Sequence, residues 1–250
     1  MSLLRDLHLL LPREGYAPDE REGLVHLVAL LAGLGSPPDP CGLLTNYASL
    51  HDQLDEALGG SDGDAIEEAF LNLYAHLHGH EAPYTPEERG RVNATGGYWC
   101  HAGGLSPVLK APRHLHAAST SADLGAGNGL QLLLLQRLAP HARSVQIEIS
   151  SCMIEAGRAL QGWLDIPQAR VEWRCADLGT AKIPDADLLY LYRPLRPEGS
   201  GAVFYQRLAA AVEARTEATV IFSIADPLHA FLPRRFERFY SDGHLTCYRS

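Results

Sequence analysis

Lysine is scarce in this sequence: among its 250 residues, Lys110 and Lys182 are the only two. The formal net charge is −9, so most of the surface is acidic. An acidic surface disfavours a long groove that follows nucleic-acid phosphates, although Arg234, Arg235 and Arg238 allow a local basic patch. The charge balance therefore favours a small molecule or a peptide as partner, and makes a nucleic-acid partner unlikely.

Long apolar runs are missing as well. No stretch reaches the roughly 18 consecutive apolar residues that a membrane-spanning helix needs. The first residues, Met1 to Asp6, lack the basic start and the cleavage site of a signal peptide. We therefore expect a cytoplasmic protein with no membrane segment.

The cysteines and histidines lack the spacings of a structural metal site. The five cysteines are scattered and form no Cys-x-x-Cys pair, so neither a zinc ribbon nor a disulfide framework is expected. Cys152, Cys175 and Cys247 fall in predicted helix or strand and are expected to be small buried thiols. His76 and His80 are four residues apart and would share a helix face, but no third ligand follows. No metal site is predicted.

Residues 1–95 carry helical patterns only. Leu24, Leu27 and Leu31 follow helical spacing, and Asp19 is the expected cap of their helix. Thr85-Pro-Glu-Glu88 has the composition of a capping box with proline in the first helical position. The segment 1–95 is therefore predicted to be a helical domain that shapes a substrate pocket.

An unusual loop dominates the predicted linker, residues 96–117. Between two pairs of glycines, at 96–97 and 103–104, it contains Tyr98, Trp99 and His101. Such a loop can close over a ligand as a lid, with Tyr98 against the cofactor and Trp99 and His101 against the substrate. The alternative is that these side chains fill the gap between two domains, and both interpretations stay open.

From residue 118 to 250, strands alternate with helices. Parallel strands are expected near 121–124, 144–149, 170–174, 187–192 and 219–224. Two final strands are joined by Asp242-Gly243, a hairpin turn signal. The predicted fold class is α/β: a doubly wound, mostly parallel seven-stranded sheet with a C-terminal antiparallel hairpin, preceded by an all-α N-terminal domain.

A glycine-rich turn links the first predicted strand to its helix, in the sequence Asp123-Leu-Gly125-Ala-Gly127-Asn-Gly129. Its glycines permit positive φ and a close approach of the backbone to a ligand. The dinucleotide-binding fingerprint has its third glycine one residue later, where this chain has Leu130. A nicotinamide or flavin enzyme is therefore disfavoured.

The turn resembles motif I of the class I S-adenosylmethionine (SAM)-dependent methyltransferases. The resemblance extends in order to Glu148, to Asp177 and to the segment 187–194, and it covers residues 118–250. It implies a methyltransferase that uses SAM and releases S-adenosylhomocysteine (SAH). The implied cofactor contacts are the turn (Gly125, Gly127 and Gly129) and Asp123 for the methionine part, Glu148 for the ribose and Asp177 for the adenine.

Residues that could contact the methyl acceptor are expected at the ends of the fourth and fifth predicted strands. Tyr192 and Arg193 are candidates for substrate contact, and His229 is a candidate base because its ordinary pKa suits proton transfer near neutrality. The Asn/Asp-Pro-Pro-Tyr/Phe motif of enzymes that methylate planar nitrogens is missing, which argues against nucleobase or amide nitrogen.

The predicted function is transfer of a methyl group by SN2 displacement to a small molecule or a peptide. Two alternatives stay open: a protein-lysine methyltransferase, and a SAM-binding scaffold or regulatory protein without turnover.

Overall fold

The computed structural model describes residues 3–11, 15–60, 62–79, 84–97 and 104–250. The part before the sheet is helical: α1 (Leu3–Leu10), α2 (Pro18–Ala32), α3 (Tyr47–Gly59), α4 (Gly63–Leu77), α5 (Pro86–Thr95) and α6 (Leu105–Lys110). The elements that follow include β1 (Thr120–Leu124), α7 (Leu130–Leu138), β2 (Arg143–Glu148), α8 (Ser151–Trp163), β3 (Val171–Cys175), β4 (Leu188–Tyr192), α9 (Gly199–Glu213), β5 (Val220–Ile224), β6 (Glu237–Ser241) and β7 (Leu245–Arg249). None of the described helices is both long and apolar enough to cross a membrane.

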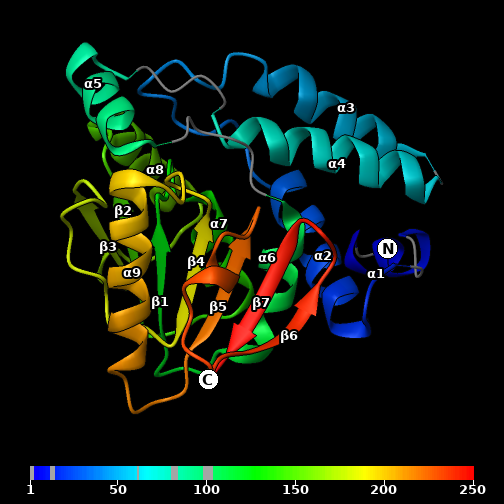
Figure 1. Cartoon of the computed structure of the whole chain (residues 1–250). Coiled ribbons are helices and arrows are strands. Elements are labelled where there is room, and N and C mark those ends of the chain that lie inside the picture. Colours follow the sequence, from blue (N-terminus) through cyan, green and yellow to red (C-terminus); the bar gives the residue numbers. More distant parts are fainter. Residues whose placement is uncertain (1–2, 12–14, 61, 80–83, 98–103) are drawn as a thin grey trace.

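A seven-stranded sheet in the order β3-β2-β1-β4-β5-β7-β6 organises the C-terminal half (Figure 1). β1 to β5 are parallel, whereas β7 runs antiparallel to both β5 and β6. The predicted fold class is thereby confirmed, including the closing hairpin. The order of the chain reverses between β1 and β4, and ligands of open α/β sheets bind in the crevice at the carboxyl ends of such strands.

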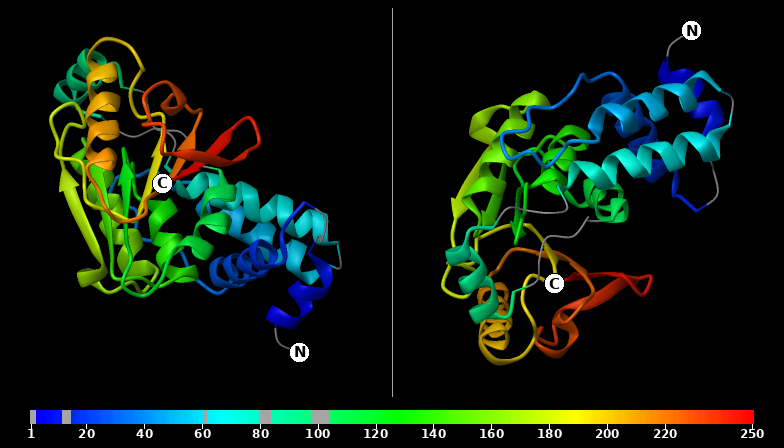
Figure 2. Two further views of the ribbon diagram at one scale, coloured as in Figure 1. Left: turned by 60° about the horizontal axis from the view of Figure 1, so that its bottom comes forward. Right: turned by 90° about the horizontal axis from the view of Figure 1, so that it is seen from above.

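Helices cover both faces of the sheet (Figure 2). Because side chains alternate along a strand, Leu189 and Leu191 of β4 pack with Phe204 and Leu208 of α9. Tyr190, which lies between those two leucines, packs on the other face with residues of α7. This second face, covered by α6, α7 and α8, is the one that turns toward the N-terminal helices.

Helix α7 is enclosed by protein on all sides. Every residue from Leu130 to Gln136 is buried. Leu133 and Leu134 share one apolar cluster with Leu24 and Leu27 of α2. The N-terminal helices therefore complete the core of the sheet's first helix, and do not build a separate core of their own. The proposed division at 95 and 117 stays a prediction.

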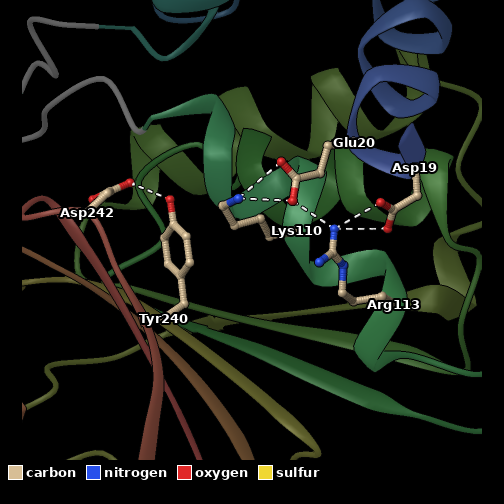
Figure 3. Close-up of polar contacts among 6 residues, drawn as sticks. All are labelled: Asp19, Glu20, Lys110, Arg113, Tyr240 and Asp242. Carbon is tan, nitrogen blue, oxygen red and sulfur yellow. Dashed lines mark hydrogen bonds and ion pairs between the residues drawn. The ribbon is translucent and has the colours of Figure 1, made fainter. Parts of the chain in front are cut away.

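An ion-pair cluster attaches α2 to the segment before β1 (Figure 3). The Glu20 carboxylate is buried and accepts from Lys110 Nζ at 2.9 and 3.0 Å and from Arg113 Nη2 at 2.7 Å. Lys110 also lies over the ring of Tyr240, 4.3 Å from its centroid. One of the two lysines of the chain thus joins α2, α6 and β6.

Asp19 belongs to the same cluster, so its prediction as a helix cap is wrong. The cap residue of α2 is Ala17, because Pro18 fits the first helical position with its fixed φ. Asp19 therefore lies in the first turn, where its carboxylate is 3.0 Å from Arg113 Nη2. The capping box of α5, in contrast, is confirmed: Thr85 and Glu88 exchange both expected hydrogen bonds.

The cysteines depart from the expectation of no disulfide. Cys41, in the loop between α2 and α3, is bonded to Cys152 in the first turn of α8, 111 residues away. Cys175 is a free thiol but is exposed, so its expected burial is also wrong, whereas Cys247 is free and buried as expected. Nothing in the spacing of the cysteines indicates that this loop crosses the start of α8, and for that reason the pairing could not be predicted.

Candidate active site

A cavity lies at the carboxyl edge of the sheet, around the point where β1 and β4 diverge. Its walls come from the glycine turn, the ends of β2 and β4, the segment after β3, the C-terminal end of α4, the start of α7, and α5 with its flanking residues. It gathers three carboxylates that follow or end successive strands, Asp123, Glu148 and Asp177. The chain thus brings together the residues for which the sequence predicted cofactor contacts after β1, β2 and β3.

The glycine turn satisfies most of its own backbone donors. Gly125 and Gly127 have φ of 95° and 57°, conformations that other residues rarely adopt. The amides of Gly125 and Ala126 both donate to the Ile147 carbonyl, at 3.0 and 2.9 Å. The Gly127 amide donates to Glu148 Oε2 at 2.8 Å. These N–H groups are therefore directed at protein acceptors.

Gly129 is required for a different reason. A Cβ at this position would lie 2.6 Å from the ring of Trp173, which is closer than side-chain atoms approach one another. Its φ of 69° adds a second restriction. Gly129 therefore fits the start of α7 against β3, and it is not among the residues that line the cavity.

Both carboxylate oxygens of Glu148 accept hydrogen bonds from backbone amides. Only 5% of the residue is exposed, and besides the Gly127 amide it accepts from the amides of Ile149 and Ser150 at 2.8 and 2.9 Å through Oε1. Burial raises the pKa of Glu148, and the three backbone donors oppose that rise. Because its position is fixed from both sides, Glu148 holds the glycine turn in place at the same time as it faces the cavity.

Asp123 has a contrasting environment. It is 1% exposed, and its Oδ1 has no hydrogen-bond partner among the described residues. Burial, and then the nearby charge of Glu148, raise the pKa of Asp123 well above its usual range. A buried carboxylate oxygen without a donor is costly. A ligand that supplies a donor, or a positive charge, relieves that cost.

Two further polar atoms of residues in the cavity wall are also buried without a hydrogen-bond partner among the described residues. Tyr190 pairs with Asp123 in the register of β4 and β1, and its hydroxyl has no partner among the described residues. Gln131 lies on the first turn of α7; its Nε2 donates to the Gly104 carbonyl at 2.9 Å, whereas its Oε1 has no partner there. Burial and the charge of Asp123 raise the pKa of Tyr190, which keeps the hydroxyl protonated.

Asp177 lies two residues after β3. Its Oδ1 accepts from the Gly179 amide at 2.7 Å, which fixes the loop between Ala176 and Leu178, both of which line the cavity. Asp177 lines the same cavity as Glu148 and Ile149. This placement fits a contact with a planar base whose ribose is bound at Glu148.

Helix α5 forms one wall of the cavity. The sequence had assigned this helix to the helical domain. Val92 and Thr95 line the cavity, and Glu88 Oε1 accepts from the Ser151 amide at 3.0 Å. At its end the Gly96 carbonyl accepts from the Arg196 amide at 2.9 Å. α5 is thereby tied to α8 and to the loop after β4, and it lies near α9 and apart from α1–α4 (Figures 1 and 2).

The predicted acceptor-side residues are only partly brought together. Tyr192 lines the cavity, and its ring meets the ring of His244 edge-on at 5.8 Å between centroids. Arg193 is half-buried with φ of 34° and does not line the cavity. His229 is exposed in a short turn after β5, also away from the cavity wall.

Other predicted residues lie beyond what the structure describes. Tyr98, Trp99 and His101 of the predicted lid are outside the described residues, and so is His80. Within the described ranges no group of three or more side chains is arranged to hold a metal ion.

Gln131, His78 and Tyr84 also line the cavity, and the sequence predicted a ligand contact for none of them. For Gln131 a signal was present. It is the single polar residue in the run Leu130–Leu135, and a polar side chain in a buried apolar run needs a hydrogen-bond partner, which a ligand can supply. His78 and Tyr84 flank a segment that no pattern places near the sheet.

The chain matches no protein-family model, and no curated protein is significantly similar to it. Solved structures that are similar in fold include an RNA methyltransferase from Salinibacter ruber in complex with SAH, with 22% identity over 68% of this chain and 92% of that chain and a TM-score of 0.41. A SAM-dependent methyltransferase from Thiobacillus denitrificans, also with SAH, shows 18% identity over 58% of this chain and 49% of that chain, with a TM-score of 0.36. A putative rRNA methylase from Clostridium thermocellum shows 12% identity over 58% and 94%, with a TM-score of 0.44. At these identities and TM-scores the similarities do not transfer an activity or a substrate to this chain.

Proposed function

We propose that this protein is a SAM-dependent methyltransferase. The observation that carries the proposal is the way in which the glycine turn uses its amides. Dinucleotide sites present such N–H groups to a pyrophosphate. Here the amides of Gly125, Ala126 and Gly127 donate to Ile147 and Glu148, and the unpartnered carboxylate oxygen of Asp123 stands beside them. The turn therefore suits a ligand without phosphate and with a cationic end, which describes SAM.

The three carboxylates have separate roles in this proposal. Asp123 accepts from the α-ammonium of the methionine part, Glu148 accepts from the ribose hydroxyls, and Asp177 accepts from the adenine amino group. Bound SAM supplies a methyl group already activated by its positive sulfur. The residues of the cavity have only to align the acceptor and exclude water, which is the main contribution a protein makes to such a displacement.

The acceptor in this proposal is a small molecule or a peptide. A protein-lysine methyltransferase, in which Tyr192 and its neighbours line a channel to the surface, is the second candidate. The third is a SAM-binding scaffold without turnover, because Arg193 and His229 lie away from the cavity wall and supply no base there.

Titration calorimetry with SAH and with NADH tests the cofactor. We expect saturable binding of SAH and none of NADH. Asp123→Asn should weaken SAH binding at least about tenfold, the scale of a lost charge-assisted hydrogen bond. Asp52→Asn on the exposed face of α3 is the matched control and should bind as the parent does. Binding of NADH but not SAH would overturn the proposal, whereas SAH binding without methylation of any acceptor would favour the scaffold.

A further inference from the structure

Asp123, Glu148 and Asp177 are the acidic residues that line the cavity. None of the described lysines or arginines lines it. A phosphate or carboxylate on the acceptor would therefore enter a cavity of like charge without a lysine or arginine as partner, at a cost in desolvation.

The uncharged part of the wall is made for a hydrogen-bond donor. Gln131 Oε1 can only accept, and the Tyr190 hydroxyl can accept as well as donate. Both atoms are buried and have no partner among the described residues, and both residues are at least nine-tenths buried. A buried acceptor without a donor costs free energy, so the two atoms together fit a ligand group that offers two N–H or O–H bonds.

Counting donors separates the common methyl acceptors. A thiol or an alcohol has one hydrogen to offer, and a carboxylate or phosphate dianion has none. A neutral primary amine has two N–H bonds and one lone pair. With both N–H bonds directed at Gln131 and Tyr190, the lone pair is left to face the methyl group.

We propose that the acceptor is a primary amine on a phosphate-free molecule, and that Gln131 Oε1 and the Tyr190 hydroxyl accept its two N–H groups. This inference rests on the methyltransferase function proposed above. In the reaction the lone pair of the amine forms a bond to the methyl carbon, and the carbon–sulfur bond breaks with its electron pair left on sulfur. The additional proton on nitrogen then passes to water.

The rest of the wall agrees with an amine. Tyr84 and Tyr192 add aromatic surface, on which the weakly positive N–H groups and an alkyl or aryl body are both accommodated. Asp123 lies beside Tyr190 and adds negative potential at the same end of the cavity. The source of the amine is either a free small molecule or a lysine side chain, and the experiment below distinguishes the two.

The test uses three probes that differ in one group: phenethylamine, phenethyl alcohol and phenethyl phosphate. Each is added to the full chain with SAM, and product is identified by mass; a lysine-containing peptide with blocked ends is the fourth probe. We expect methylation of phenethylamine or of the peptide, according to the source of the amine, and none of the alcohol or the phosphate. Binding of the same probes to the SAH-loaded protein, measured by calorimetry, gives a readout that does not depend on turnover.

Tyr190→Phe is the informative variant. It removes a hydroxyl that has no partner among the residues that the structure describes, so the fold should be undisturbed. We expect kcat/KM for the amine, and its affinity for the SAH-loaded protein, to fall about tenfold, with SAH affinity unchanged. Gln131→Leu should act in the same direction, and its melting temperature reports the loss of the bond to Gly104. Tyr240→Phe, at a half-buried position of β6 that does not line the cavity, is the matched control.

The outcomes separate the two proposals. Preference for the alcohol or phosphate, reaction with none of the probes, or full amine activity in Tyr190→Phe overturns the amine assignment while SAH binding leaves the cofactor assignment intact. Failure of the parent protein to bind SAH overturns the methyltransferase proposal itself.

Discussion

Each of the two ends of the cavity contains a buried carboxylate, and the two carboxylates differ in their hydrogen-bond partners. At one end Glu148 receives three backbone donors, Glu88 joins α5 to the start of α8, and a disulfide holds the same helix from outside. At the other end Asp123, Tyr190 and Gln131 each leave a buried polar atom without a partner among the described residues. The first end is finished before any ligand arrives, and the second is completed by the ligand. Substitutions should therefore cost stability at the first end and function at the second.

The disulfide should show the largest effect at the finished end. Cys41→Ser opens a bond that closes a separation of 111 residues, and we expect the free energy of unfolding to fall by about 2–4 kcal/mol. Urea unfolding of the two proteins measures this. Cys175→Ser, at an exposed free thiol, is the control and should unfold as the parent does. If the parent loses no stability in the presence of a dithiol reductant, the bond does not contribute.

Glu148→Gln should cause the next largest loss of stability. The amide nitrogen that replaces one carboxylate oxygen is a donor, so either the Gly127 amide or the pair from Ile149 and Ser150 loses its acceptor. We expect a loss of about 2 kcal/mol, the cost of a buried donor left unpaired, together with loss of SAH binding. Urea unfolding and calorimetry measure the two effects. A variant that is fully stable but does not bind SAH would show that Glu148 acts on the ligand alone.

Asp123→Asn should not cost stability. For this variant we expect a small gain in thermal stability. The raised pKa of Asp123 means that the folded protein holds this proton more tightly than the unfolded chain does. The resulting stability is fully present below the ordinary pKa of 3.8 and is lost as pH rises through the raised value. Asparagine has no proton to lose, so above that range the variant should melt higher than the parent. The two should converge at low pH.

Thermal melts from acid to alkaline pH test this sign. A variant that melts below the parent at alkaline pH would mean that Asp123 has a stabilising partner in the empty protein, contrary to the unpartnered Oδ1. Glu148 contributes to the same pH dependence, since its pKa is also raised, and for that reason the difference between parent and variant is the quantity to compare.

The sequence predicted the sheet, and the gathering of three carboxylates at its edge, because both depend on local patterns. The glycines after β1, the alternating strands and the Asp-Gly hairpin each specify backbone geometry over a few residues, and the register then brings Asp123, Glu148 and Asp177 to one edge. The rest of the cavity wall depends on contacts between distant segments. Cys41 meets α8, and α5 crosses to the loop after β4, through chain paths that no local pattern records. The chemistry of His229 alone made it a candidate base, and the turn after β5 leaves it exposed.

The enclosure of α7 has a consequence for how the protein is made. Leu24 and Leu27 share a core with Leu133 and Leu134, which leave the ribosome more than a hundred residues later. At ~5–20 residues per second this delay is roughly 5–20 s, during which the part of α2 that packs on α7 lacks that partner. We therefore expect the nascent N-terminal helices to bind chaperones, and a gene fragment that stops before residue 130 to yield insoluble protein.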